Sequence, residues 1–140
     1  MKKVGIVGGS GYTAGELIRL LLNHPKLKID FIYSSSKPNT FVYETHKDLI
    51  GSLKLKFTNT INPKIDVVFL CLGHGNSYKF LDKFIFSNET KIIDLSSDFR
   101  LFKNNRFKNF NFIYGLPEFE INKIKKAKKI ANPGCFATAI

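Results

Sequence analysis

Apolar residues fall in short blocks along the chain, and the spacing within each block predicts strands that alternate with helices. Strands are expected over residues 3–7, 27–33, 66–72, 91–95 and 129–131, with a further short one over 53–57. Helices are expected over residues 11–23 and 77–86. The run 66–72 is unbroken and apolar, which is typical of a parallel strand covered on both faces. This order predicts an α/β fold with a doubly wound, mostly parallel sheet of the Rossmann type.

The helix over residues 11–23 has the clearest pattern. Its buried stripe is expected to consist of four apolar residues, namely Leu17, Ile18, Leu20 and Leu21. Asn23-His24-Pro25 should end it, because proline cannot continue a helix and restricts the residue before it. Other segments lack a clear period. They are a polar stretch over 34–51, an aromatic-rich loop over 99–114, and a turn over 115–118 that leads into a basic segment.

The composition fits one globular domain, with 140 residues of which 44% are hydrophobic and 24% are charged. No apolar run is long enough to cross a bilayer. The first residues are too short and too broken by glycine to form a signal peptide. A cytoplasmic protein without a membrane partner is therefore expected.

The net charge of +11 taken alone would also suit binding to nucleic acid, acidic membranes or phosphorylated metabolites. No nucleic-acid recognition motif accompanies the charge, so no nucleic-acid partner is expected. Much of the lysine is instead assigned to solvated surface. This assignment includes the densest group, which is Lys123, Lys125, Lys126, Lys128 and Lys129.

A glycine-rich turn joins the first predicted strand to the first helix, with the spacing Gly8-x-x-Gly11-x-x-Ala14. Such a turn lets the backbone approach a pyrophosphate closely, and the helix N-terminus supplies unpaired N–H groups. The strand before it and the helix after it are the context that a dinucleotide site requires. The alternative is a turn that is tight for packing reasons alone.

The residues after the second strand bear on which dinucleotide is bound. An NAD site usually has a carboxylate there, roughly 20 residues after the turn, to hold the ribose hydroxyls. This chain has no carboxylate at that place and carries hydroxyls and a cation instead, in Ser34, Ser36 and Lys37. Hydroxyls with a cation suit a 2′-phosphate, so NADP is favoured over NAD. The alternative is an ordinary polar loop.

The second chemical feature is Asn132-Pro133-Gly134-Cys135, which follows the last predicted strand. The Pro-Gly pair gives a sharp entry into a helix, and a helix N-terminus stabilises a thiolate and makes it a better nucleophile. Cys135 is therefore predicted to be placed for reaction. Cys71 lies within an apolar strand and is predicted to be a small buried residue.

The histidines give weaker signals. Cys71-x-x-His74 has the spacing of metal ligands, but structural zinc needs four ligands. The chain has only two cysteines and three histidines, widely scattered, so no metal site is expected. His74 follows a strand at its carboxyl end, where ligands bind in such sheets, and it either lines the site or is an exposed loop residue. His24 and His46 give no functional signal.

Four segments of the chain resemble the N-acetyl-gamma-glutamyl-phosphate reductase family, relatives of aspartate-semialdehyde dehydrogenase in arginine biosynthesis. The matching segments are GGSGYTAGELIRLL (8–21), IIDLSSDFRL (92–101), IYGLPE (113–118) and ANPGCFATA (131–139). The last resembles the family's active-site signature. The resemblance covers nearly the whole chain.

The resemblance implies that Cys135 is the catalytic nucleophile and that NADP(H) is the cofactor. It implies that Ser10, Gly11, Tyr12 and Thr13 lie against the cofactor phosphates, with residues 34–36 near the adenosine ribose. It places His74 and residues 96–98, Ser97 among them, at the nicotinamide side. Many relatives have an arginine where this chain has Ser35, so Lys37 or the hydroxyls would hold the 2′-phosphate here.

The resemblance further implies that residues 1–140 are the NAD(P)-binding domain, ending at the catalytic cysteine turn. In the family a second α/β domain follows and supplies a catalytic histidine, substrate-binding arginines and the interface of a homodimer or homotetramer. A C-terminal helix of the family usually returns to the nucleotide domain. This chain therefore corresponds to the front part of such an enzyme, and the second domain is absent from it.

The implied reaction is the NADPH-dependent reduction of N-acetyl-L-glutamyl 5-phosphate to N-acetyl-L-glutamate 5-semialdehyde through a cysteine thioester. Two alternatives stay open. A sister acyl-phosphate reductase would act on an aspartyl or aminoadipyl substrate. The chain alone would be a nucleotide-binding fragment without activity of its own.

Overall fold

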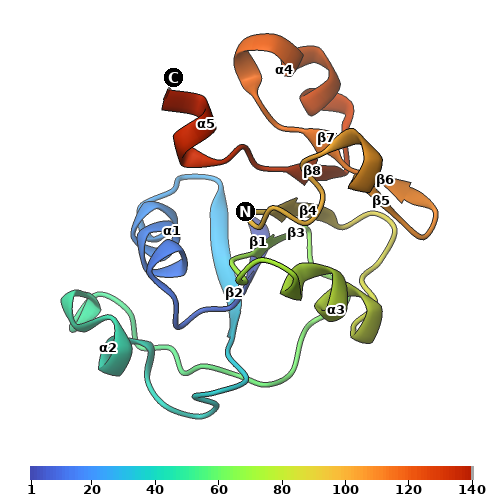
Figure 1. The fold of residues 1–140 in the computed structure, drawn as a ribbon. Coiled ribbons are helices and arrows are strands. Elements are labelled where there is room, and N and C mark those ends of the chain that lie inside the picture. The colour runs from blue at the N-terminus through green and yellow to red at the C-terminus, as the bar shows by residue number, and fades with distance from the viewer. Residues whose placement is uncertain (140) are drawn as a thin grey trace.

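The computed structural model describes residues 1–139. Its centre is a six-stranded sheet in the order β2-β1-β3-β4-β8-β7, in which every neighbouring pair is parallel (Figure 1). The strands are β1 (Lys2–Val7), β2 (Leu27–Tyr33), β3 (Val67–Leu70), β4 (Lys91–Asp94), β7 (Ile113–Tyr114) and β8 (Lys129–Ala131). The chain runs outward from β1 to β2 and then returns to β3 on the other side, which gives the doubly wound order. The predicted fold class is confirmed.

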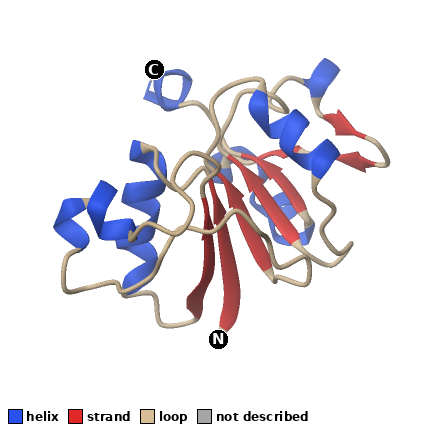
Figure 2. Ribbon diagram, turned by 90° about the horizontal axis from the view of Figure 1, so that it is seen from below, coloured by secondary structure: helices blue, strands red, loops and turns tan. Residues whose placement is uncertain are grey.

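Helices lie on both sides of this sheet (Figure 2). The helices are α1 (Tyr12–Leu22), α2 (Val42–Thr45), α3 (Asn76–Lys83), α4 (Pro117–Lys126) and α5 (Cys135–Ala139). A 3₁₀ turn (Lys47–Leu49) follows α2, and another (Phe102–Asn104) precedes a small antiparallel hairpin of β5 (Arg106–Phe107) and β6 (Phe110–Asn111). Among residues 1–139 no helix is both long enough and apolar enough to cross a bilayer.

Two apolar cores pack against the two faces of the sheet. Val4 and Ile6 of β1 join the core beneath α1, whereas Val7 belongs to the core beneath α3. Successive side chains of a strand point to opposite faces, so a single strand supplies both cores. The second core is rich in aromatic rings, and Phe99 and Phe112 stack there with their ring centroids 4.1 Å apart.

The stripe expected on the first helix is wrong at Leu20, which is 73% exposed. The helix buries Ala14, Gly15, Ile18 and Leu21 instead. Positions 14, 18 and 21 recur at the helical spacing of three and four, and residue 20 lies off that line. Ala14 and Gly15 are small, so the start of α1 can pack closely, with Gly15 against His46. The buried face of the helix is therefore the one that contains residues 14 and 15.

The region after β4 contains more regular structure than expected. The aromatic stretch 99–114 folds into the 3₁₀ turn, the β5–β6 hairpin and the edge strand β7, and the basic segment after Leu116 forms α4. Residues 53–57 do not form a strand, although Lys56 makes an isolated bridge to Phe41. The helix predicted over 77–86 ends at Lys83.

Lys129 is also wrongly assigned to solvated surface, because it is buried. Its Nζ donates to the carbonyl of Thr90 at 2.7 Å and lies 5.0 Å from the ring centroid of Phe110. Desolvation lowers the pKa of Lys129, since burial disfavours the charged form. The other four lysines of the group are exposed.

The burial pattern of α1 gives a stability prediction. Replacing Ile18 by Ala should lower the free energy of unfolding by about 2–5 kcal/mol, because it empties part of a fully buried site. Replacing Leu20 by Ala, two residues away on the same helix, should change it by less than about 0.5 kcal/mol. Urea denaturation followed by circular dichroism measures both. Equal losses in the two variants would contradict the observed stripe.

Candidate functional site

The glycine turn leaves β1 at the carboxyl edge of the sheet. Gly8 has a φ of +80°, and a Cβ built on it would lie 2.4 Å from the carbonyl oxygen of Cys71. Both facts exclude a side chain, because positive φ is strained for other residues and the neighbouring backbone fills the space. The turn therefore lies tightly against the end of β3.

Hydrogen bonds hold this turn at its base. The N–H groups of Gly8 and Gly9 both donate to the carbonyl of Tyr33, at 3.1 and 2.9 Å, and Gly11 N–H donates to Gly8 at 3.2 Å. Helix α1 then starts with Gly11 as its N-cap, without a side-chain cap and without an acidic residue in its first turn. The first N–H groups of a helix have no partner within it, so this end presents donors and a positive dipole. Such an end suits an anion.

The end of β2 carries the three residues predicted to select NADP. Ser34 is buried, with its Oγ 3.3 Å from the Oγ of Ser36. Ser36 and Lys37 are exposed, and Lys37 Nζ donates to Thr45 Oγ1 at 3.1 Å. The structure thus leaves a hydroxyl and an ammonium group accessible at the end of the strand.

The turn after β3 contains His74, which is exposed. Its Nδ1 accepts a hydrogen bond from the Ser97 N–H at 3.0 Å, so the proton of the neutral ring is on Nε2. Asp98 accepts from the N–H groups of Gly75 at 2.6 Å and Tyr78 at 3.1 Å, and so caps the start of α3. The structure brings His74 and Ser97 together, as expected for two residues of one site.

A crevice at the carboxyl edge of the sheet lies between the glycine turn after β1 and the turn after β3. It is lined by Gly11, Tyr12, Thr13, Cys71, Leu72, Gly73, His74 and Leu95. It therefore unites predicted residues of the glycine turn with the predicted histidine. Cys71 follows the end of β3 and lines the crevice half-buried, so its prediction as a buried residue within the strand is wrong. Ser34, Ser36 and Lys37 are not among its lining residues and stand at the end of the neighbouring strand β2.

The last residue of β4 is the buried Asp94, which precedes Leu95 of the crevice and binds the residues around the end of the strand. Asp94 accepts hydrogen bonds from Ser77 Oγ at 2.5 Å, Ser96 Oγ at 2.7 Å and Ser96 N–H at 3.2 Å. Desolvation raises the pKa of Asp94, and the serine hydrogen bonds oppose that rise. The network ties the loop that bears Ser97 to the first turn of α3.

The loop before Cys135 is held by Arg100, a residue not predicted to belong to the site. Its Nε donates to the carbonyl of Asn132 at 2.8 Å, and its Nη2 donates to that of Leu95 at 2.9 Å. A Cβ on Gly134 would lie 2.8 Å from Arg100 Nη1, so the loop passes directly over the guanidinium. One side chain thereby joins the ends of β4 and β8. The SSDFR motif was the available signal for it.

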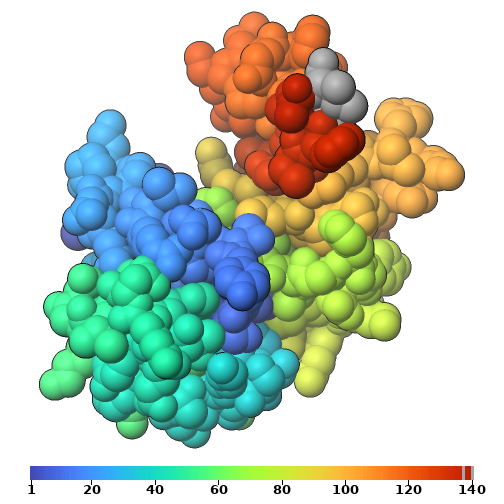
Figure 3. Space-filling model, turned by 60° about the vertical axis from the view of Figure 1, so that its left-hand side comes forward, coloured from blue at the N-terminus to red at the C-terminus, as the bar shows by residue number. Residues whose placement is uncertain are grey.

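Cys135 is exposed at the start of α5. It lies in a second cleft at the same edge, formed with the start of α4 and lined by Gly115, Leu116, Pro117, Glu118, Asn132, Pro133, Thr138 and Ala139. In Figure 3 the red C-terminal segment and the blue N-terminal segment appear on one face of the molecule. Cys135, predicted to be placed for reaction, is thus open to solvent beside this cleft.

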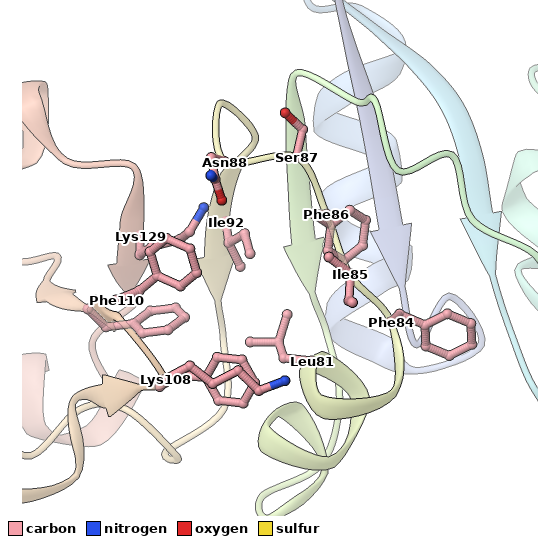
Figure 4. Close-up of a pocket in the computed structure, with 12 residues that line it drawn as sticks. Leu81, Phe84, Ile85, Phe86, Ser87, Asn88, Ile92, Lys108, Phe110 and Lys129 are labelled. Atoms are coloured by element: carbon pink, nitrogen blue, oxygen red, sulfur yellow. The ribbon is translucent and has the colours of Figure 1, made fainter.

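An apolar pocket lies away from this edge. Its lining side chains come from the end of α3 and the segment after it, from β4, from the hairpin and from Lys129 at the start of β8 (Figure 4). Parallel strands of this class of sheet bind ligands at their carboxyl ends, and this pocket is at the opposite edge. Among residues 1–139 no group of three or more His, Cys, Asp or Glu side chains is gathered as metal ligands.

Comparison with protein families bears on what this edge does. Residues 3–127 match the model of the semialdehyde dehydrogenase, NAD binding domain, family. The chain belongs to this family. The glycine turn and the crevice beside it are therefore parts of a nicotinamide-dinucleotide-binding domain.

Individual relatives are close in sequence. The chain is 56% identical to the N-acetyl-gamma-glutamyl-phosphate reductase of Flavobacterium johnsoniae, over all of its own length and 43% of the relative. It is 55% identical to the reductase of the same name from Christiangramia forsetii, over 42% of that relative. The corresponding reductase of Karelsulcia muelleri is 51% identical and is covered to 43%. The chain thus spans less than half the length of these relatives.

A solved structure shares the fold. Aspartate semialdehyde dehydrogenase from Candida albicans, determined with NADP, superposes with a TM-score of 0.62 over 97% of this chain and 43% of that one. The sequences are 20% identical, so this likeness concerns the fold alone. It agrees with the doubly wound sheet of the semialdehyde dehydrogenase NAD binding domain.

The two cysteines should differ strongly in reactivity. Burial, with a smaller effect of Asp94, raises the pKa of Cys71 to about 12, so roughly one thiol in ten thousand is ionised at pH 8. Iodoacetamide at pH 8 should therefore modify the exposed Cys135 and leave Cys71 unmodified in the folded protein. Peptide mass mapping measures this, with urea-unfolded protein as the control in which both react. Equal labelling in the folded state would contradict the raised pKa of Cys71.

Proposed function

We propose that the complete protein reduces N-acetyl-L-glutamyl 5-phosphate to N-acetyl-L-glutamate 5-semialdehyde with NADPH, using Cys135 as the nucleophile. The observation that carries this proposal is the exposed Cys135 on a loop held by Arg100, at the sheet edge that also bears the dinucleotide turn. Relatives at 55–56% identity that are named as this reductase support the choice of substrate. The aspartyl and aminoadipyl phosphates are the alternative substrates.

The residues at the first turn fit a dinucleotide. The lack of a side chain at Gly8 lets the turn pack against the end of β3, and the uncapped start of α1 offers N–H donors to a pyrophosphate. We assign the pyrophosphate to Gly8 and the first residues of α1, with Ser10, Gly11, Tyr12 and Thr13 in contact. We assign the nicotinamide side to His74 and Ser97, which share a hydrogen bond. NADPH, when bound, supplies the hydride of the reduction.

The proposed role of Cys135 has two parts. Its sulfur attacks the acyl carbon of the substrate, the bond from that carbon to the phosphate oxygen breaks, and phosphate leaves with the electron pair. The product of this step is a thioester on Cys135. After hydride addition to the thioester carbon, the carbon–sulfur bond breaks, and the semialdehyde and the Cys135 thiolate are released.

Arg100 is proposed to hold Cys135 in its reactive position. The guanidinium donates to the Asn132 carbonyl before the cysteine and to the Leu95 carbonyl after β4, so the loop cannot shift relative to β4 without breaking one of these hydrogen bonds. A displacement of about 1 Å at a reacting group is enough to lower a rate a hundredfold. The hydrogen bond from Ser97 to His74 holds the imidazole in one tautomer in the same way.

The proposal extends to the rest of the protein. Residues 1–140 would form the dinucleotide-binding domain, and alone they would bind the cofactor without turnover. A second domain would supply substrate-binding groups and the surface of a homo-oligomer. As an enzyme of small-molecule biosynthesis, the protein would act in the cytoplasm.

The nucleophile is tested by Cys135→Ser in the full-length protein. Because a serine hydroxyl is almost wholly un-ionised at neutral pH, turnover should fall by about a thousandfold or more. The assay follows NADP reduction with N-acetyl-glutamate semialdehyde and phosphate. NADPH affinity measured by fluorescence should stay within about twofold, which separates a chemical defect from misfolding. Retained turnover would remove Cys135 from this role.

The choice of NADPH is tested at Lys37. Loss of a charge-assisted contact to the 2′-phosphate is worth about 1.5 kcal/mol or more, so Lys37→Gln should raise the KM for NADPH about tenfold. The KM for NADH should not change, because NADH lacks that phosphate. Lys64→Gln, at another exposed lysine, is the matched control. Equal changes for both nucleotides would assign Lys37 to a plain polar loop.

A further inference from the structure

His46 lies buried against the glycine turn, although nothing in the local sequence marks it. Its Nε2 is 2.7 Å from the carbonyl oxygen of Gly9, and the residue is only 8% exposed. A carbonyl can only accept, so Nε2 carries the proton and donates. The contact joins residues 37 positions apart, because the segment of α2 and the following 3₁₀ turn folds back against α1.

This hydrogen bond sets the direction of the next backbone donor. In a trans peptide unit the carbonyl and the following N–H point to opposite sides. A Gly9 carbonyl held toward His46 therefore directs the Ser10 N–H away from it. Within residues 1–139 the Ser10 N–H makes no hydrogen bond, and it stands next to the uncapped start of α1. The histidine thus orients a donor that is available to an anion.

The other side of the imidazole explains Gly15. A Cβ on Gly15 would lie 2.7 Å from His46 Nδ1 and 2.9 Å from Cε1. Glycine inside a helix is unfavourable by about 1 kcal/mol relative to alanine, so its place in α1 needs a packing reason. The ring supplies that reason: one nitrogen contacts α1 while the other bonds the turn.

The segment that carries His46 is itself held in place. Arg19 of α1 binds the Asp48 carboxylate with two nitrogens, at 2.5 and 2.8 Å, and this contact lowers the pKa of Asp48. Val42 and Leu49, on either side of His46, are buried in the core beneath α1. The imidazole is therefore presented to Gly9 from a fixed support.

We infer that His46 is a positioning residue for the dinucleotide, acting through the Gly9 carbonyl on the Ser10 N–H. The inference rests on the dinucleotide binding of the proposed function and not on its acyl substrate. It makes α2 and the 3₁₀ turn a support for the pyrophosphate site.

The direct test measures NADPH affinity of the full-length protein by fluorescence. His46→Asn places its amide nitrogen near the position of Nδ1 and loses the donor to Gly9, so the Kd should rise about tenfold. His46→Gln places an amide nitrogen near the position of Nε2 and should restore the Kd to within about threefold of the native value. In steady-state assays His46→Asn should raise the KM for NADPH while kcat changes less than twofold.

Two controls separate positioning from general damage. His24→Asn is the same substitution at an exposed histidine outside the site and should leave the Kd unchanged. The melting temperature of each variant without nucleotide reports folding. If His46→Asn and His46→Gln melt alike but differ in Kd, the effect lies in the donor and not in stability.

A second test uses the contact between His46 and Gly15. Gly15→Ala should weaken NADPH binding, because the new methyl group pushes the ring away from Gly9. In a His46→Asn background the same Gly15→Ala change should cause no further weakening. Independent, multiplying losses in the double variant would contradict a route through the imidazole.

The outcomes distinguish the two proposals. If the native protein binds neither NADPH nor NADH, the proposed function fails. If the native protein binds NADPH and His46→Asn binds it equally well, the positioning role of His46 is refuted and the proposed function stands. An equal loss in His46→Asn and His46→Gln would also refute it, since the donor would then be irrelevant.

Discussion

Pairing of β1 on both sides is the constraint on which the site depends. Val7, its last residue, lies between Tyr33 of β2 and Leu70 of β3 in the parallel ladders. The Tyr33 carbonyl receives the first two N–H groups of the glycine turn, and the Val7 carbonyl receives the Cys71 N–H at 2.8 Å. A slip of one residue in either ladder would reverse the faces of the strand and displace the turn. The β1–β2 ladder shifts its register once, between Val4 and Gly5, and then stays in step to Val7 and Tyr33. The two buried cores hold this second half of the ladder, so packing away from the edge fixes the geometry at the edge.

A second level of organisation links the turns to one another. The Asp94 side chain accepts hydrogen bonds from Ser96 in the loop after β4 and from Ser77 at the start of α3. The backbone carbonyl of Asp94 accepts from the Asn132 N–H at 2.8 Å. Arg100, in the same loop after β4, donates a hydrogen bond to the carbonyl of Asn132 in the turn before Cys135. The turn before Cys135 and the proposed nicotinamide side are thus joined by one continuous set of hydrogen bonds. Polar side chains hold the loops at the strand ends in position, as apolar side chains hold the strands in the core.

Sequence periodicity was sufficient wherever an element is long or wholly apolar. The β1–α1–β2 unit and β3 were predictable for that reason, whereas β4 and the three-residue β8 were predicted although each begins with a lysine. The β5–β6 hairpin was not, because strands of two residues carry no measurable period. Helix α4 has proline at its first position and lysines in its last turn, yet it buries no residue and so lacks an apolar stripe.

The site residues that escaped prediction act over long sequence separations. His46 and Arg100 work on carbonyls 37 and 32 residues away, and such contacts have no local pattern. Leu20 shows the reverse case, an apolar residue with a suitable local pattern that tertiary packing leaves in solvent. Motifs therefore indicated the residues proposed for the chemistry, whereas the residues that hold them in place became visible only in three dimensions.

The position of β8 between β4 and β7 also has a consequence for biosynthesis. Among residues 1–139 the edge strand β7 pairs with β8 alone, and β8 follows it in the chain, so the ladder of β7 cannot form before residues 129–131 have been synthesised. The turn that leads to Cys135 follows β8 directly. The strand that joins β7 to the sheet therefore also places the Cys135 sulfur at the carboxyl edge of the sheet.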